Sequence, residues 1–187
     1  MKVAVRNDHS VVISDLLEQH LAFLVAVPVV IALAARPPWD SDPVVGDGDP
    51  AFDDLREDWK LIVQPELRAH CEHEIDILLG DVAGARAQGG ADVPPVENVF
   101  HFLEGSSHEI FIPRAHVEPW YGALNQARLA LESIHGFSAR LLDEADDWPV
   151  EMKFAFWQYR IYSAFQEGLL TSMENQFDAG QDENPAG

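Results

Sequence analysis

Two groups of residues in this sequence have types and spacings that could support chemistry. The first lies in residues 66–74, "ELRAHCEHE", where Glu66, His70 and Glu74 recur at four-residue steps with His73 beside them. Residues four apart lie on one face of a helix, and imidazole and carboxylate groups placed together in this way can bind zinc or iron. These four residues are the candidate metal ligands of the chain.

An ordinary solvated helix face is the simpler interpretation of the same residues. The sequence does not repeat the Glu-x-x-His motif that supplies the ligands of di-iron bundles, and the polar face lies opposite an apolar stripe that runs from Leu67 to Val82. The sequence also contains no Gly-x-Ser-x-Gly nucleophile motif and no glycine-rich phosphate loop. It therefore predicts no metal, no cofactor and no catalytic residues.

The second group interrupts an otherwise apolar helical run, "EPWYGALNQARLALESIHGF" (118–137). With about 100° of rotation per helical residue, Trp120, Leu124 and Leu131 form one apolar arc, and Arg128 falls inside it. Burying an unpaired charge costs several kcal/mol, so an arginine that faces the core must find hydrogen-bond acceptors. The surroundings of Arg128 therefore decide what this helix does.

Three roles are open for Arg128. In the first, Asn125, three residues before it, and Glu132, four residues after it, join it in a buried network that fixes helix packing. In the second, Arg128 binds an anion or another ligand, and in the third it contacts a partner protein. The sequence favours the packing network, because 32 acidic residues make a carboxylate partner easy to supply.

The same helix carries a family resemblance. The segment "IPRAHVEPWYGALNQARLALESIHGF" resembles the bacterial domain-of-unknown-function family two thousand seventeen, whose members show Trp-Leu-x-x-Leu-Asn-x-x-Arg-Leu-x-Leu after an acidic helix entry. The motif positions filled in this sequence are Trp120, Leu124, Asn125, Arg128, Leu129 and Leu131, with Tyr121 in place of a leucine. More weakly, "FWQYRIYSAFQEGLL" resembles the family's C-terminal helix and its Gln-Glu pair, here Gln166 and Glu167. The resemblance implies a small helical cytoplasmic protein without an established activity.

The charge balance limits the partners that the chain can bind. Its 187 residues include 32 acidic and 12 basic ones, which gives a net charge of −20. Proteins that bind nucleic acid gain affinity from Lys and Arg that neutralise phosphates, so we expect neither nucleic acid nor an anionic membrane as a partner. The acidic surplus favours solubility, and a basic protein is the kind of partner that it would attract.

Sequence features also indicate where the protein works. The apolar run of residues 21–35 is interrupted by Pro28 and is shorter than the roughly 20 residues that span a bilayer, so we expect a buried core helix there and no membrane segment. The N-terminal residues lack the apolar core of a secretory signal. The single cysteine, Cys71, fits a reducing compartment. Together these features predict a cytoplasmic protein.

The pattern along the chain predicts a mainly α fold, a single compact helical domain with one or two small β-hairpins. We expect this domain to cover residues 1–177 and a flexible acidic tail to cover residues 178–187. Alternating apolar residues and turn signals predict the hairpin strands at 2–6 with 10–13 and at 98–103 with 108–112.

Helical periodicity predicts four longer helical segments. They cover residues 15–34, 52–86, 114–135 and 149–174. We expect Ser14 to cap the first helix, and Pro28 and Pro65 to kink or break the helices that contain them.

The last of these helices is apolar on two sides. Val150, Phe154 and Trp157 lie on one side, and Phe156 and Tyr159 lie roughly opposite. Such a helix is either the centre of its own domain or part of a shared interface. A symmetric homodimer is the commonest assembly of soluble proteins, and both arrangements stay open.

These observations favour a non-enzymatic regulatory or protein-interaction domain with an unknown protein partner, for which a second copy of the chain is one candidate. The residues expected to have a structural or interaction role are Trp120, Asn125, Arg128, Glu132, Gln166 and Glu167. The alternative is a metal- or small-anion-dependent enzyme that uses the His70/His73 face or Arg128.

Overall fold

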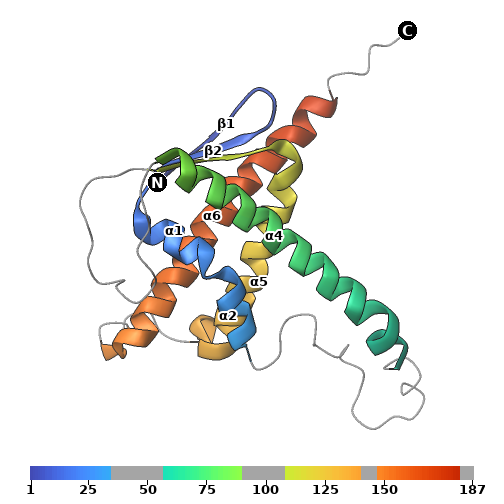
Figure 1. Ribbon diagram of the computed structural model, residues 1–187, viewed down its shortest axis with the longest axis vertical. Helices are drawn as coiled ribbons and strands as arrows, with labels where there is room; N and C mark the ends of the chain where they lie inside the picture. The colour runs from blue at the N-terminus through green and yellow to red at the C-terminus, as the bar shows by residue number, and fades with distance from the viewer. Residues whose placement is uncertain (35–56, 90–107, 140–146, 182–187) are drawn as a thin grey trace.

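The computed structural model of the chain describes residues 1–34, 57–89, 108–139 and 147–181. Helices dominate these residues, and a small antiparallel sheet lies at one end of them (Figure 1). The predicted mainly α fold with a small β component is confirmed. No helix among the described residues is long and apolar enough to cross a membrane.

The sheet has three antiparallel strands in the order β1 (Lys2–Val5), β2 (Val11–Leu16) and β3 (His108–Ile112). Its register places Ile13 opposite Val3 on one side and opposite Ile110 on the other. The predicted N-terminal hairpin is confirmed, and β3 is the expected last strand of the second hairpin. The other predicted strand, residues 98–103, lies outside the described residues.

The start of the first helix differs from the prediction that Ser14 caps it. The chain stays extended through Leu16, with a register irregularity at Asp15, whose φ is +57° and whose carboxylate binds Lys2 at 2.8 Å. Helix α1 (Glu18–Val25) begins only after Leu17, whose N–H donates to His20 Nδ1 at 3.1 Å. The polar residues that resembled a helix start instead belong to a β-bulge, which accommodates one extra residue in a strand.

The predicted break near Pro28 is confirmed. Helix α1 ends before Ala26, and α2 (Val27–Leu33) begins directly after it with Pro28 in its first turn. A proline costs little there, because the N–H that it lacks has no partner in the first turn of a helix. The buried side of α2, which includes Val30 and Ile31, packs against the helix that carries Arg128.

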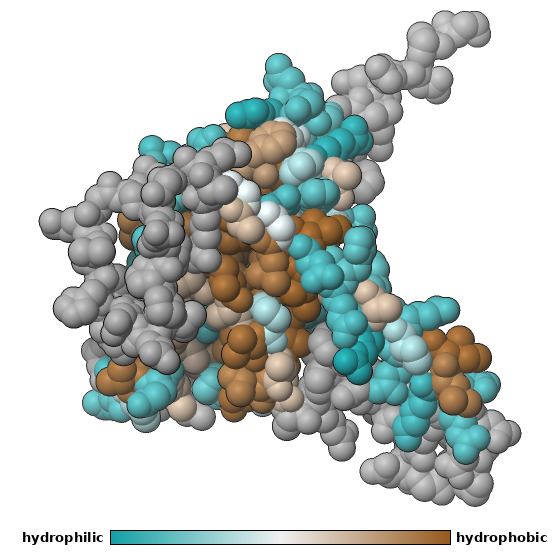
Figure 2. Space-filling view, viewed as in Figure 1, coloured by the Kyte–Doolittle hydropathy of each residue, from teal (hydrophilic) through white to brown (hydrophobic). Residues whose placement is uncertain are grey.

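Pro65 does not end the helix in which it lies. The chain forms a π-helical turn, η3 (Trp59–Val63), and continues as α4 (Gln64–Gly89). The wider turn bonds Gln64 N–H to Trp59 O, five residues back, and so accommodates a proline that cannot donate a bond of its own. Leu61 and Ile62 are exposed there, and Figure 2 shows an apolar patch over this projecting end of the helix.

Helix α5 (Val117–His135) is the central helix, because it packs against α2, α4 and α6 (Val150–Gln181). A short turn, η5 (Arg114–His116), leads into it. Gly136 ends it with φ +63°, a left-handed conformation that glycine adopts without strain. A further turn, η6 (Phe137–Ala139), follows.

Helix α6 buries one side and exposes another. Tyr162, Phe165 and Leu169 are buried against the core, whereas Val150 and Trp157 are 64% and 65% exposed. The predicted side with Val150, Phe154 and Trp157 is therefore exposed within the described part of the chain, whereas Phe156 and Tyr159, on the opposite side, pack against the core. The central position belongs to α5 rather than to α6.

Candidate functional site

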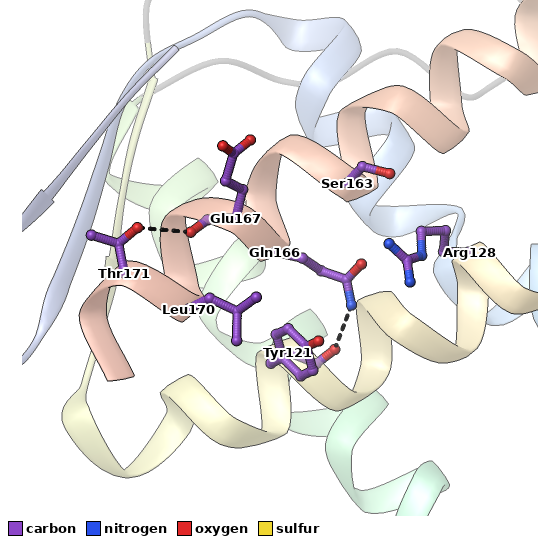
Figure 3. Close-up of a pocket in the computed structure, with 7 residues that line it drawn as sticks. All are labelled: Tyr121, Arg128, Ser163, Gln166, Glu167, Leu170 and Thr171. Carbon is purple, nitrogen blue, oxygen red and sulfur yellow. Dashed lines mark hydrogen bonds between the residues drawn. The ribbon is translucent and has the colours of Figure 1, made fainter. Parts of the chain in front are cut away.

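A groove between α5 and α6 contains a partly open cavity of about 320 Å³ (Figure 3). Ligand-binding pockets usually have volumes of roughly 300–1,000 Å³, so this cavity is at the lower end of that range. Both helices contribute polar and apolar side chains to its walls. The residues that line it are Tyr121, Arg128, Ser163, Gln166, Glu167, Leu170 and Thr171.

Arg128 is the cation of this groove. It is half-buried, its Nη2 donates a long hydrogen bond of 3.4 Å to Asn125 Oδ1, and it forms no ion pair with any of the described residues. The proposed partner Glu132 is engaged elsewhere, because its carboxylate accepts hydrogen bonds from the N–H of Ser138, at 3.1 Å, and from the Ser138 hydroxyl. Arg128 therefore keeps most of its five N–H donors available to a ligand.

Gln166 is the buried polar group of the groove. Its side chain is 3% exposed, and its Nε2 donates to Tyr121 O and to Asn125 Oδ1, each at 3.4 Å. Its Oε1 is buried and accepts no hydrogen bond from the described residues. Buried polar atoms without partners are rare, so each one calls for a physical explanation.

Asn125 holds these two side chains together. Its Oδ1 accepts hydrogen bonds from both Arg128 and Gln166. Figure 3 shows Arg128 on α5 and Gln166 on α6. Asn125 also lies on α5, so its contact with Gln166 joins the two helices. Of the six residues predicted to have a structural or interaction role, these three meet at one place. Glu167 lines the same groove, but Figure 3 shows its carboxylate directed away from Gln166.

Trp120 belongs to a separate buried cluster between α4 and α5. It is fully buried, and its Nε1 donates to Asp81 Oδ2 at 2.9 Å. His116 Nδ1 lies 2.9 Å from the same oxygen. A carboxylate that ties helices together therefore exists, as expected, but it holds Trp120 rather than Arg128. Sequence reasoning missed Asp81, because nothing in the local pattern links it to residues 35 and 39 positions away.

The candidate metal ligands do not converge in the described structure. Glu66 and His73 are exposed, whereas Glu74 is buried and its Oε1 lies 3.2 Å from His70 Nε2. Among the residues described, no group of three or more His, Cys, Asp or Glu side chains is placed to hold a metal ion. Burial and the neighbouring Glu74 raise the pKa of the Cys71 thiol to about 11, so at neutral pH it is a protonated core side chain.

Glu74 packs closely against the backbone of α5. A Cβ atom at Gly122 would overlap the Glu74 carboxylate, so the glycine allows the two helices to approach each other there. Loss of solvation is the main cause that raises the pKa of Glu74, Glu118 adds to it, and His70 and His73 oppose it. The folded protein therefore holds a proton on Glu74 more tightly than the unfolded chain does.

We expect Glu74→Gln to raise the melting temperature at pH 7. Because the pKa of Glu74 is higher in the folded state, stability is lost as the pH rises through that pKa, and a neutral glutamine avoids this loss. The gain should shrink as the pH falls towards the ordinary pKa of glutamate. Thermal melts across this pH range measure it, with the exposed Glu66→Gln as control. A gain that does not depend on pH would contradict the explanation.

One of three comparisons with known proteins gave a match. Neither the search of curated proteins nor the search of solved structures gave a match. A family model described as "Domain of unknown function (DUF2017)" matches residues 3–173, which include all of α5, β2 and β3 and most of α6 and β1. The chain therefore belongs to this family.

Proposed function

We propose that the chain is a non-enzymatic protein-interaction domain and that the α5–α6 groove binds an anionic group of its partner. The observation that carries this proposal is Arg128, a half-buried guanidinium that Asn125 orients and that no described carboxylate neutralises. Planar guanidinium groups bind carboxylates through paired N–H donors. A residue that only fixed helix packing would have its charge paired.

The hydroxyl groups of the groove support binding rather than catalysis. Ser163 Oγ donates to Tyr159 O at 2.9 Å, and Thr171 Oγ1 donates to Glu167 O at 3.1 Å. Both hydroxyl protons are thus used within α6, and neither hydroxyl hydrogen-bonds to a base among the described residues. A nucleophilic hydroxyl needs an adjacent base to activate it, so the groove supplies recognition groups and not an activated nucleophile.

The charge of the chain indicates the kind of partner. A net charge of −20 attracts proteins that are basic overall and repels nucleic acid. We infer a basic partner that offers one local anionic group to Arg128. The proposal includes a cytoplasmic location, which is supported by the presence of only one cysteine.

We expect Arg128→Gln to leave the fold intact and to remove binding. Because Arg128 makes one long hydrogen bond and is only half-buried, its replacement should change the free energy of unfolding by no more than about 0.5 kcal/mol. Thermal melts measure this. A photo-crosslinking amino acid at Leu170, which lines the cavity, should capture a partner protein from native lysate. The capture should be lost in Arg128→Gln.

Two controls make this experiment specific. Arg160→Gln removes an exposed arginine of α6 that does not line the cavity, and it should preserve the crosslink. The same photo-crosslinker at Leu129, an exposed residue outside the cavity, should not give the adduct. A fall of several degrees in the melting temperature of Arg128→Gln would show instead that Arg128 is a packing residue.

Self-association stays a prediction that rests on the exposed side of α6. Val150, Phe154 and Trp157 recur three and four residues apart and are all exposed, which gives one continuous apolar strip on the helix. Light scattering at micromolar concentration tests it, since a dimer has twice the 20.8 kDa mass of the chain. A monomer mass would contradict the homodimer.

A further inference from the structure

The groove has a second unsatisfied group besides Arg128. Gln166 Oε1 is a buried carbonyl oxygen that accepts no hydrogen bond from the described residues. Water-exposed oxygens are solvated without difficulty, whereas a buried one destabilises the fold unless something donates to it. Two groups of the groove therefore lack a partner among the described residues: Arg128 lacks an anion, and Gln166 Oε1 lacks a hydrogen-bond donor.

The surroundings of Gln166 fix which end of its amide is unsatisfied. Its Nε2 faces two acceptors, Tyr121 O and Asn125 Oδ1. Asn125 Oδ1 also accepts from Arg128 Nη2, which confirms that this atom is the oxygen of the asparagine. Turning the Gln166 amide around would set its oxygen against two other oxygens. Figure 3 accordingly shows Oε1 on the side of the amide away from Tyr121.

A ligand that satisfies both groups carries a carboxylate for Arg128 and an N–H for Gln166 Oε1. The two protein groups lie close together, because Arg128 Nη2 and the Nε2 atom of the Gln166 amide are each 3.4 Å from Asn125 Oδ1. Figure 3 shows Gln166 Oε1 on the side of that amide nearer Arg128. In a polypeptide, the terminal carboxylate and the last main-chain N–H are attached to the same Cα. An aspartate or glutamate side chain holds its carboxylate farther from the main-chain N–H and on rotatable bonds.

We propose that the groove captures the C-terminal residue of the partner protein. This inference rests on the proposed function, since it names the group of the partner that Arg128 binds. Capture of a C-terminal carboxylate is a recurrent mode of peptide recognition. A cavity of about 320 Å³ has room for a terminal residue and not for a helix. Leu170 and Tyr121 line the same cavity and give it apolar surface, so the last residue has an apolar side chain.

Fluorescence anisotropy with synthetic peptides tests this inference on the full chain. The probe is a labelled pentapeptide, Gly-Ser-Gly-Ala-Leu, with a free carboxylate. Three comparison peptides are used. The first has a C-terminal amide, the second has an N-methyl group on the last peptide bond, and the third moves the carboxylate by combining an internal glutamate with a C-terminal amide. The free peptide should bind at least about tenfold more tightly than each comparison peptide, because each loses or misplaces one of the two contacts.

Variants of the chain assign the contacts. Arg128→Gln and Gln166→Leu should each weaken binding of the free peptide at least about tenfold, and Arg160→Gln should leave it unchanged. Because Gln166→Leu also removes hydrogen bonds to α5, Gln166→Glu is a second variant of nearly the same shape. Its added negative charge should weaken binding of the free peptide more than binding of the amidated peptide.

The outcomes separate this inference from the proposed function. If the internal-glutamate peptide binds as tightly as the free peptide and Arg128→Gln weakens both, the C-terminus is not the ligand, while the groove remains an anion-binding interaction site. If the N-methylated peptide binds as tightly as the free peptide, Gln166 Oε1 does not accept a hydrogen bond from the last main-chain N–H of the ligand. If no peptide binds and the Leu170 crosslink is also absent, both the inference and the proposed function are wrong.

Discussion

The Asp81→Ala variant should lose about 3 kcal/mol of folding free energy, which corresponds to a fall in the melting temperature of roughly 6–12 °C for a chain of this length. Asp81 Oδ2 accepts the Trp120 indole N–H at 2.9 Å and lies 2.9 Å from His116 Nδ1. Alanine leaves the indole N–H without an acceptor in a fully buried side chain. Thermal or urea unfolding followed by circular dichroism measures the loss.

The position of the cluster makes this effect large. It joins α4 to the start of α5, the helix against which α2, α4 and α6 pack. A hydrogen bond to a charged acceptor contributes more than a neutral one, and leaving its buried donor unpaired costs the desolvation of that donor. The loss therefore falls on the centre of the fold and not on an exposed helix end.

Two variants give the control for Asp81→Ala. Asp81→Asn keeps an oxygen for the Trp120 N–H but loses the negative charge beside His116, so it should cost clearly less than alanine. Asp76→Ala removes an exposed acid from the same helix and should change stability by less than about 0.5 kcal/mol. Equal losses for Asp76→Ala and Asp81→Ala would show that only helix charge matters.

The regular elements were largely predictable because their signals are local. The alternation in β1 and β2 and the three- and four-residue apolar steps of α4 and α5 are set by which side of an element faces the core. At Ser14 the prediction was wrong, because the polar residues there fit a bulged strand as well as a helix start. Near Pro65 the α-helix is interrupted, as predicted, but by a π-helical turn and not by an end of the helix. A β-bulge accommodated the polar residues after Ile13, and a π-turn accommodated the proline.

The candidate site was predictable only in part. Helical spacing brought Asn125 to Arg128, and the structure places their side chains 3.4 Å apart. Helical spacing also suggested Glu132 as an ion-pair partner for Arg128. The left-handed turn at Gly136 instead brings the Ser138 N–H back to Glu132. An unpaired backbone N–H at close range competes with an arginine for the same carboxylate, and the spacing of side chains does not reveal it.

Contacts between helices were the least predictable part of the site. Gln166 meets Asn125 across 41 positions, and Asp81 meets Trp120 across 39. With 32 acidic residues in the chain, the composition cannot tell which carboxylate is buried beside a tryptophan. Only the packing of α4 and α6 against α5 selects these pairs.

Tyr162→Phe should also be strongly destabilising, by about 2 kcal/mol or roughly 4–8 °C in melting temperature. The Tyr162 hydroxyl is buried, donates to Phe23 O at 2.7 Å and accepts from Gln158 Nε2 at 2.8 Å. It ties α6 to the last turn of α1, beside the break at Ala26. Phenylalanine fills the same space but leaves the Gln158 amide without this acceptor, and among the described residues it leaves Phe23 O with only the N–H of Ala26, at 3.2 Å. Unfolding in urea measures the loss.

A double variant separates the hydrogen bonds from the packing. Replacing both partners of a buried hydrogen bond by apolar groups costs less than leaving one of them unpaired. Gln158→Leu with Tyr162→Phe should therefore lose less stability than the two single variants together. Tyr159→Phe, which removes a hydroxyl without a hydrogen bond to any described residue, should stay within about 0.5 kcal/mol of the unchanged chain. Strict additivity in the double variant would mean that Gln158 and Tyr162 stabilise the chain independently.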